Sequence, residues 1–399
     1  MHTEHPRIQA PRRHVDHGGS PMSSNHTYDA GTLWRRSDQP QQHAATVARI
    51  AEEVAAAGRV PAISVAVAGS TGIHYAGAVG YADLAQRRPA TVADQYPWFS
   101  MTKIATATAS MRLHTRGVLD LDAPIGVYLP AYRPHPKHGH PTMRQLLTHT
   151  AGLGNPMPIQ WVRAEHDPAD PAQLEHIVRK YGTPRRGVGA RAGYSNIGYL
   201  LAANVIEAVT GRTVEEVVSE AVLKPMGMTA TGYRYRPDTS RATGYVRCPS
   251  AVVPALRALL PDGIVGHRVA GYTSLKPFLV NGAGYGGLIG TVTDAARFAA
   301  AHAAGASDNH PLLNHGDLEA MRATTHRGKR FDHGIGWFRK PTDANRSPAF
   351  VEHYGTGGGF WNAMRIYPED RLAMVAMANT TAQWNVDKLF TALKELTWT

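Results

Sequence analysis

Two pairs of strand-like segments, one near each end of the chain, place the tightest constraint on how this sequence folds. The N-terminal pair reads PAISVAVAG and GIHYAGAVGYAD, with a turn between its members. The C-terminal pair reads NAMRIYP and RLAMVAMAN, and Glu369 and Asp370 lie between them as a hairpin turn. Because strands bury their apolar side chains against partners, we predict one sheet built from both chain ends, with the intervening residues inserted between them.

Helical patterns accompany these strands and fill the middle of the chain. The segment QHAATVARIAEEVAAAG predicts a helix that ends at Gly58, and GYLLAANVIEAVTG predicts a buried helix that ends at Gly211. Thr213 and Glu216 form a capping box for the helix that follows. Apolar residues recur at helical spacing near the two chain ends: Val47, Ile50, Ala51 and Val54, and Val386, Leu389, Phe390 and Leu393.

The 399 residues, 43% of them apolar, suffice for a sizeable core. Residues 1–40 are rich in His, Arg, Pro and Ser without periodicity, so we predict a flexible N-terminal arm. Residues 41–399 then form the folded domain. We assign 41–105 and 285–399 to its α/β part and 106–284 to a mainly helical part.

Two further stretches have the composition of long loops. Residues 155–190 are rich in Pro and Arg, and residues 250–280 are apolar without a clear period. Long loops in compact domains often carry function. We therefore expect these two stretches to form the walls of a binding pocket.

Charge and cysteine content exclude several classes of function. The formal net charge is +11, but the basic residues are scattered and form no dense run, so we predict no nucleic-acid partner. A single cysteine, Cys248, excludes an intrachain disulfide and a cysteine zinc site. The first 45 residues lack the apolar core of a secretory signal, and no apolar run approaches the ~18 residues of a membrane span. We predict a cytoplasmic protein without a membrane partner.

The segment WFSMTKIATATASMRLH contains the first candidate for chemistry. Ser100 and Lys103 are three residues apart at a predicted helix start, with an apolar helical face after them and a stop at Gly117. A lysine beside a serine at a helix N-terminus is the geometry that activates serine without histidine. It requires a neutral lysine, which costs about 4–5 kcal/mol at pH 7 unless burial or nearby cations lower the pKa. Taken alone, the pair is equally compatible with an ordinary capped helix.

Two further motifs follow in order. Tyr194 and Asn196 flank a serine in RAGYSNIGYLL, and His353 and Gly355 begin the glycine-rich part of EHYGTGGGFWNAMRIYP. Ser-x-x-Lys, Tyr-x-Asn and His-x-Gly in this order resemble the serine β-lactamase and penicillin-binding-protein family, most closely the class C β-lactamases and their esterase relatives. Segments similar to family signatures connect them: TMRQLLTHTAGL, LKPMGMTAT, GYGGLIGTVTDAARF and GIGW. The resemblance covers about residues 45–395.

The resemblance implies an α/β (α+β) β-lactamase-like fold, in which an antiparallel sheet from both chain ends is flanked by helices and a mostly helical subdomain is inserted. It implies that Ser100 is the nucleophile, that Lys103 accepts or relays its proton, and that Tyr194 shares the proton transfer. It also implies that Asn196 binds the substrate carbonyl or amide. The alternative for Asn196 is an N-cap of the helix at 197–209.

The third motif departs from the family pattern. His353 stands where β-lactamases and peptidases usually have a lysine that holds the substrate carboxylate, and histidine is only partly charged at pH 7. Esterase-like members often have histidine here. The resemblance further implies an oxyanion hole made by the backbone N–H groups of Ser100 and Thr356, with Gly355 allowing close approach of the backbone.

These inferences combine into a serine acyl enzyme of the Ser-x-x-Lys type. We expect a small-molecule ester or amide substrate, an acyl group carried on Ser100, and transfer to water or to an amine or alcohol acceptor, as in an esterase or a biosynthetic transacylase. A β-lactamase, a D-amino-acid peptidase and a non-catalytic binding relative stay open, as does the oligomeric state. The segment HPKHGH lacks further ligands at a recognisable spacing, so we predict no metal and no cofactor.

Overall fold

A computed structural model describes residues 43–157, 161–305 and 312–398. The predicted N-terminal arm, residues 1–40, lies outside the described residues. Within them, an antiparallel eight-stranded sheet has the order β11-β12-β13-β14-β15-β1-β2-β3. Its strands are β1 (Ala62–Gly69), β2 (Gly72–Asp83), β3 (Arg88–Pro89), β11 (Asp332–His333), β12 (Phe338–Arg339), β13 (Val351–Gly357), β14 (Phe360–Tyr367) and β15 (Leu372–Ala378).

The two chain ends meet at the centre of this sheet. β1 pairs on one edge with β2 and on the other with β15, so that Ile63 lies opposite both Val79 and Ala378. All eight residues of β1 are buried, because helices cover both faces of the sheet at this point. The prediction of a sheet built from both chain ends is confirmed, together with the two hairpins.

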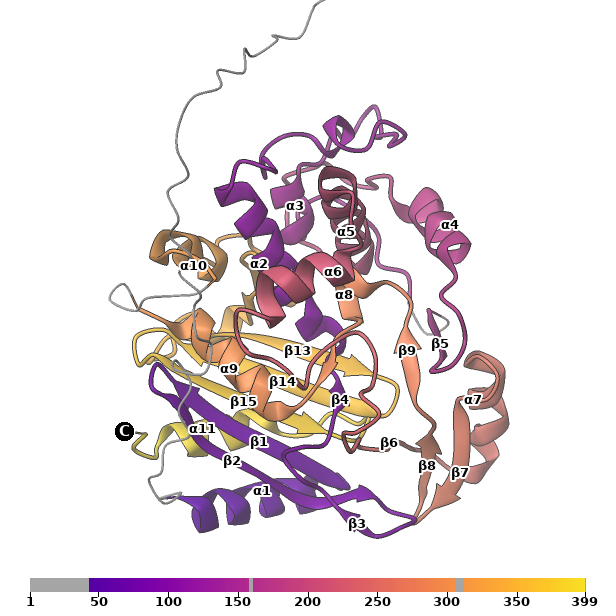
Figure 1. The fold of residues 1–399 in the computed structure, drawn as a ribbon, viewed down its shortest axis with the longest axis vertical. Helices are drawn as coiled ribbons and strands as arrows, with labels where there is room; N and C mark the ends of the chain where they lie inside the picture. Colours follow the sequence, from indigo (N-terminus) through magenta and orange to yellow (C-terminus); the bar gives the residue numbers. More distant parts are fainter. Residues whose placement is uncertain (1–42, 158–160, 306–311, 399) are drawn as a thin grey trace, which may run out of the picture.

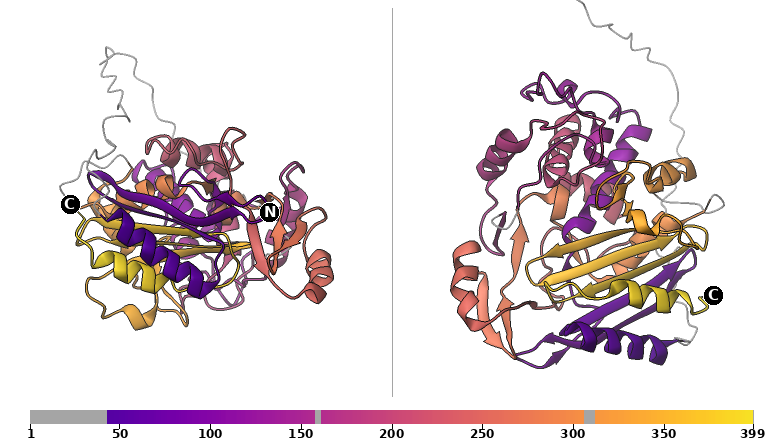
Figure 2. Two further views of the ribbon diagram at one scale, coloured as in Figure 1. Left: turned by 90° about the horizontal axis from the view of Figure 1, so that it is seen from below. Right: turned by 180° about the vertical axis from the view of Figure 1, so that it is seen from behind.

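Helices of the two chain ends cover one face of the sheet. α1 (Ala44–Gly58) and α11 (Val386–Lys394) lie side by side on it, as Figure 2 shows from below. Their apolar stripes pack on outward-facing strand residues such as Val65, Met374 and Ala376. α1 ends at Gly58 as predicted, and the next residue, Arg59, adopts a left-handed conformation with φ of 50°.

The opposite face carries α9 (Val292–Ala303) and, above it, the inserted helical part (Figure 1). The helices of the insertion are α2 (Thr102–Thr115), α3 (Met143–Leu147), α4 (Pro171–Tyr181), α5 (Asn196–Thr210), α6 (Val214–Val218), α7 (Val253–Leu259) and α8 (Ala283–Gly286); α10 (His315–Arg322) follows α9. The predicted capping box is confirmed, since Thr213 Oγ1 accepts from the backbone N–H of Glu216 while the Glu216 carboxylate accepts from that of Thr213.

The predicted loops at 155–190 and 250–280 are wrong. The first holds β5 (Val162–Ala164) and α4, whose N-cap is Asp170 and whose first residue is Pro171; a proline there starts a helix rather than breaking it. The second holds α7 and the strands β7 (Val265–Val269), β8 (Tyr272–Leu275) and β9 (Phe278–Val280). β8 pairs with β6 (Gly244–Arg247) and β7, and β9 pairs with β5, so these strands depend on distant partners. The short strands β4 (Tyr96–Pro97) and β10 (Ile289–Gly290) also pair with each other.

Candidate active site

Ser100 lies in a tight turn between β4 and α2. The turn is a 3₁₀ segment, Phe99–Met101, and the α-helix begins only at Thr102. Phe99 has φ of 45°, a left-handed conformation that a phenylalanine rarely adopts, and its ring packs against Phe278 and Phe360. Backbone strain of this kind is concentrated at functional sites and persists because the surrounding packing holds it.

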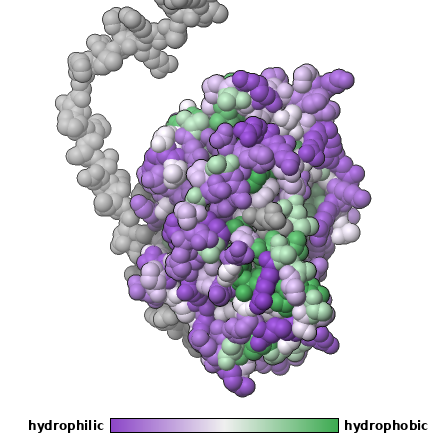
Figure 3. Space-filling model, turned by 90° about the vertical axis from the view of Figure 1, so that its right-hand side faces the viewer, coloured by the Kyte–Doolittle hydropathy of each residue, from purple (hydrophilic) through white to green (hydrophobic). Residues whose placement is uncertain are grey.

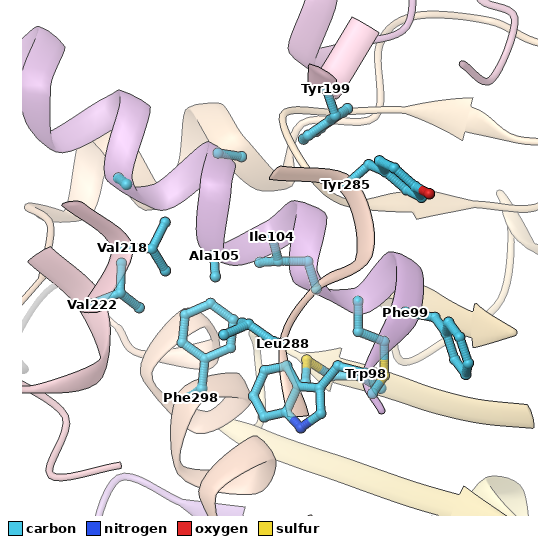
Figure 4. Close-up of a cluster of buried hydrophobic side chains, with 14 of the residues drawn as sticks. Trp98, Phe99, Ile104, Ala105, Tyr199, Val218, Val222, Tyr285, Leu288 and Phe298 are labelled. Carbon is cyan, nitrogen blue, oxygen red and sulfur yellow. The ribbon is translucent and has the colours of Figure 1, made fainter. Parts of the chain in front are cut away.

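The helix that carries Lys103 is buried on all sides along its first ten residues, Thr102–Met111. The sequence predicted a single apolar face. The helix can be buried on its other faces as well because its polar side chains form hydrogen bonds to backbone carbonyls inside the core. Thr106 Oγ1 donates to Gly284 O, and Thr108 and Ser110 donate to carbonyls four residues back. Figure 4 shows Ile104 and Ala105 surrounded by Val218, Val222 and Phe298 of neighbouring elements. The helix therefore holds Lys103 in a rigid setting.

Three polar atoms surround the Lys103 amine, whose side chain is fully buried. Nζ donates to Asn196 Oδ1 at 2.8 Å and to the Tyr285 carbonyl oxygen at 2.9 Å, and it lies 3.1 Å from Ser100 Oγ. The rings of Tyr194, Tyr199 and Tyr285 lie between 4.9 and 5.5 Å from it. Among the described residues, no ion pair joins this lysine to a carboxylate.

This set of partners suits a neutral amine. Burial lowers the pKa of Lys103 well below its ordinary value. A neutral amine has two N–H donors and one lone pair, and the carbonyl oxygens of Asn196 and Tyr285 accept the two N–H bonds. The third partner, the Ser100 hydroxyl, is the one that carries a proton to donate. A neutral Lys103 would therefore have its lone pair available for the proton of the Ser100 hydroxyl.

Tyr194 lies on the other side of Ser100, in the loop before α5. Burial raises its pKa, and a hydrogen bond with the Ser100 hydroxyl lowers it in part. The phenol is therefore neutral at pH 7. Its ring packs against that of His149, with the centroids 4.5 Å apart and the planes tilted by 33°. His149 Nδ1 accepts a hydrogen bond from the backbone N–H of Ser195, so this histidine holds the Tyr194 loop in place.

Asn196 is the first residue of α5, and Ser195 is the N-cap. Ser195 Oγ accepts from the backbone N–H of Gly198 and donates to the carbonyl oxygen of Gly154. The alternative in which Asn196 caps this helix is therefore wrong. Because Ser195 satisfies the helix end, the Asn196 side chain is available to accept from Lys103.

His353 lies on β13 and is buried, with 2% of its surface exposed. Its Nδ1 donates to the Tyr354 carbonyl oxygen, and its ring faces Phe338 and Tyr194. Burial, and then the nearby Lys103, lower the pKa of His353 well below its ordinary value. The prediction of a partly charged His353 is therefore wrong, because the histidine is neutral and supplies no positive charge beside Lys103. His353 is also absent from the lining of the cavity beside Ser100.

Gly355 and Thr356 follow on the same strand and bring it against the serine turn. A Cβ on Gly355 would lie 2.0 Å from the Trp98 carbonyl oxygen, so only glycine permits this approach. Thr356 and Ser100 both line the cavity, on opposite elements. The two backbone segments of the predicted oxyanion hole therefore border the same cavity.

A cavity of about 340 Å³ opens beside Ser100. Both predicted wall segments contribute to it, through Val162 from the first and Leu256, Leu260 and Phe278 from the second. Asn196 and Tyr285 form its floor toward Lys103. The face that contains it is shown in Figure 3, where hydrophobic side chains gather between polar ones.

Sequence reasoning missed two tyrosines of the site. Tyr285 supplies the carbonyl that fixes Lys103 and a ring that lines the cavity, and Tyr199 places a second ring beside the amine. Tyr285 lies in GYGGLIG, part of a segment similar to a family signature, and this similarity was the one indication in the sequence that Tyr285 belongs to the site. Only the packing of α8 against α2 shows that its backbone oxygen faces the lysine.

In residues 43–157, 161–305 and 312–398, no group of three or more His, Cys, Asp or Glu side chains is arranged to hold a metal ion. No helix in that part of the chain combines the length and apolar character needed to cross a bilayer.

Comparison with known proteins places this geometry in context. The Beta-lactamase family matches residues 47–396. A penicillin-binding protein of Bacillus subtilis (strain 168) is 26% identical over 319 residues, which is 77% of this chain and 65% of that protein. The esterase EstB of Burkholderia gladioli is 31% identical over 176 residues, 40% of this chain and 44% of the esterase. This chain thus spans less than two thirds of the length of either relative.

A solved structure supports the same fold. The D-amino acid amidase from Ochrobactrum anthropi SV3, in complex with L-phenylalanine, superposes with a TM-score of 0.70 at 22% identity. The superposition covers 88% of this chain and 98% of the amidase. At this level of identity the likeness shows the fold alone, an antiparallel sheet with helices on both faces and a helical insertion.

Proposed function

We propose, from the premise that this chain belongs to the Beta-lactamase family, that it is a serine hydrolase that cleaves an ester through an acyl group carried on Ser100. The observation that carries the proposal is the buried Lys103 amine, whose two N–H bonds are taken by carbonyl oxygens while its third partner, 3.1 Å away, is the Ser100 hydroxyl.

In the acylation step, Ser100 Oγ attacks the ester carbonyl carbon and its proton passes to the Lys103 lone pair. The carbonyl oxygen becomes an oxyanion, which the backbone N–H groups of Ser100 and Thr356 stabilise. The tetrahedral intermediate collapses, the bond to the alkoxy group breaks, and the alcohol leaves with a proton from Tyr194, which Lys103 reprotonates. The neutral phenol of Tyr194 suits this donor role.

Deacylation reverses the sequence with water. Lys103, again neutral, takes a proton from a water molecule that attacks the acyl carbon. Collapse of the second intermediate returns a proton to Ser100 Oγ and releases the carboxylic acid. Asn196 keeps the amine of Lys103 aimed at Ser100 through both half-reactions.

An ester substrate is favoured over a substrate with a free carboxylate. His353 is neutral and buried where the family usually has a cationic lysine, so the site lacks the charge that would hold a carboxylate. The esterase relative supports the same choice. A second candidate, acyl transfer to an alcohol or amine, is favoured by the apolar cavity beside Ser100, because a dry pocket slows attack by water.

Intact-mass measurement with a fluorophosphonate tests the nucleophile. We expect one adduct on the wild-type protein, none on Ser100→Ala, and an unchanged adduct on the control variant Ser110→Ala, whose hydroxyl is buried and bonded to the Thr106 carbonyl oxygen. An adduct that persists in Ser100→Ala contradicts the proposal, because another residue is then the nucleophile. No adduct and no ester turnover in the wild type also contradict it and leave a non-catalytic binding protein.

Product analysis separates hydrolysis from transfer. A p-nitrophenyl ester is turned over with and without a panel of amines and alcohols. Free acid alone across the panel identifies a hydrolase, whereas amide or ester product in proportion to acceptor concentration identifies a transacylase.

A further inference from the structure

The side chains that line the cavity beside Ser100 share one property. Every described residue in its wall is uncharged, and apart from Ser100, Asn196, two threonines and the Tyr285 hydroxyl they are apolar or glycine. Pockets that bind charged ligands place at least one charged or convergent polar group on the wall to offset the cost of desolvation. Among the described residues of its wall, this cavity offers a charged substrate group no side chain of opposite charge.

Strand alternation explains how basic neighbours are kept out of the cavity. Val162 and Val280 are paired on β5 and β9, and both face inward. The next residue on β5, Arg163, points to the other side, where Nε donates to Asn281 Oδ1 and the guanidinium also contacts the Asp167 carbonyl oxygen. The guanidinium of Arg163, the cation next to Val162 on this strand, therefore has its hydrogen-bond partners away from the cavity.

Helix α7 forms the outer part of the wall. Leu256 and Leu260 are half-buried and line the cavity, whereas Leu259 on the same helix is 48% exposed and does not. The rim continues in apolar form through Met157, which is 77% exposed. Both the interior and the entrance thus offer apolar surface to whatever enters.

We propose that the cavity selects esters in which the group beside the scissile bond is uncharged and apolar, and that it rejects the same group when it carries a carboxylate or an ammonium. The inference rests on the proposed ester hydrolysis at Ser100. It assigns the selection to the wall made by β5, β9 and α7, with Leu256 as a determinant of the charge preference.

Two matched pairs of esters test the charge preference on either side of the scissile bond. The first pair is p-nitrophenyl hexanoate and the p-nitrophenyl monoester of adipic acid, and the second is methyl 4-acetoxybenzoate and 4-acetoxybenzoate, whose leaving phenols are similar. For the pair whose altered group enters the cavity, we expect kcat/KM for the neutral ester to exceed that for the charged one by at least about 100-fold. A difference below about threefold in both pairs overturns the inference.

Variants of α7 connect the preference to the wall. Leu256→Lys places a cation at the cavity, and we expect it to reduce the discrimination against the carboxylate ester by at least about tenfold. Leu259→Lys is the matched control, with the same charge on the same helix outside the cavity, and it should leave the discrimination unchanged. An equal effect of the two variants would assign the change to net charge and overturn the role of Leu256.

Binding to Ser100→Ala separates this inference from the proposed function. Titration calorimetry of that variant with the hexanoate ester and the adipate monoester reports the preference without turnover. Tighter binding of the neutral ester supports the inference even if the wild type proves inactive, and equal or reversed affinities overturn it even if Ser100 proves to be the nucleophile.

Discussion

Asn196 Oδ1 accepts a hydrogen bond of 2.8 Å from Lys103 Nζ, which joins the first residue of α5 to the buried lysine of α2. The acceptor is an amide and therefore neutral. A carboxylate in the same place would stabilise the charged form of the lysine, so the choice of asparagine bears directly on whether Lys103 can act as a base.

Asn196→Asp tests this relationship with a nearly isosteric change. A carboxylate within hydrogen-bond distance raises the pKa of Lys103 and keeps the amine protonated at neutral pH, so we expect kcat/KM at pH 7 to fall by about 10- to 1,000-fold. The acid limb of the pH profile should move to higher pH. Asn196→Ala is the control, which loses the hydrogen bond without adding charge. An unchanged acid limb in Asn196→Asp would show that Lys103 does not titrate in the reaction.

Lys103→Met separates catalytic from structural roles. In the folded protein burial lowers the pKa of Lys103, whereas in the unfolded chain the lysine has an ordinary pKa and binds a proton at pH 7. The unfolded state therefore binds more protons, so this lysine destabilises the fold at every pH between its lowered folded pKa and its ordinary value.

Replacing Lys103 with methionine removes that cost. We expect a higher free energy of unfolding by about 1–2 kcal/mol and a loss of ester turnover of at least about 100-fold. Urea unfolding and steady-state kinetics measure the two effects. Ser100→Ala should lose turnover without the gain in stability. A difference in stability between Lys103→Met and the wild type that is the same at pH 7 and at pH 10 would contradict the lowered pKa of the lysine.

Gly355→Ala tests the close approach of β13 to the serine turn. The added Cβ would lie 2.0 Å from the Trp98 carbonyl oxygen, so the strand or the turn must move. We expect a loss of about 1–3 kcal/mol in the free energy of unfolding and lower kcat, since Thr356 shifts away from Ser100. Gly126→Ala, where no atom lies within 4 Å of the added Cβ, is the control and should be close to neutral.

The lowered pKa of His333 predicts that the folded protein loses stability in acid. Burial lowers its pKa from 6.5 to about 4. Between these values the unfolded chain binds more protons than the folded one, so stability falls as the pH decreases from about 6.5 to 4, by about 3 kcal/mol for this residue. Its neighbour His149 also has a lowered pKa and adds to the same trend.

Urea unfolding at pH 7 and at pH 4.5 measures that loss. In His333→Gln the difference between the two pH values should be smaller than in the wild type, because one of the buried titrating groups is gone. His315→Gln, which changes a half-exposed histidine of α10, is the control substitution, and its pH dependence is compared with that of His333→Gln. A wild-type protein with equal stability at both pH values would contradict the buried neutral state of these histidines.

Much of this molecule could be predicted because its patterns are local. Alternating apolar segments identified β1, β2, β14 and β15, and glycine stops and capping residues identified α1, α5 and α6. The spacing of three residues was enough to predict that Lys103 reaches Ser100, because such positions are neighbours on a helical turn.

The segments that failed depend on partners far away in the chain. β8 is a strand because β6 and β7 flank it, and α4 begins at a proline that composition alone suggested would break a helix. Their short or irregular apolar patterns did not distinguish a strand from a loop. The sequence thus showed which segments form the cavity wall, but it did not show which strands and helices these segments form.

The sequence by itself determined that both chain ends share one sheet, and it predicted which residues are candidates for the chemistry, since both follow from residue type, order and local spacing. Only the tertiary structure decided their protonation and surroundings. Burial by the surrounding fold lowers the pKa of Lys103, and Asn196 and the Tyr285 carbonyl, 93 and 182 residues away, accept hydrogen bonds from its amine beside Ser100. Burial and long-range hydrogen bonds depend on every packed element at once, and no local pattern encodes them.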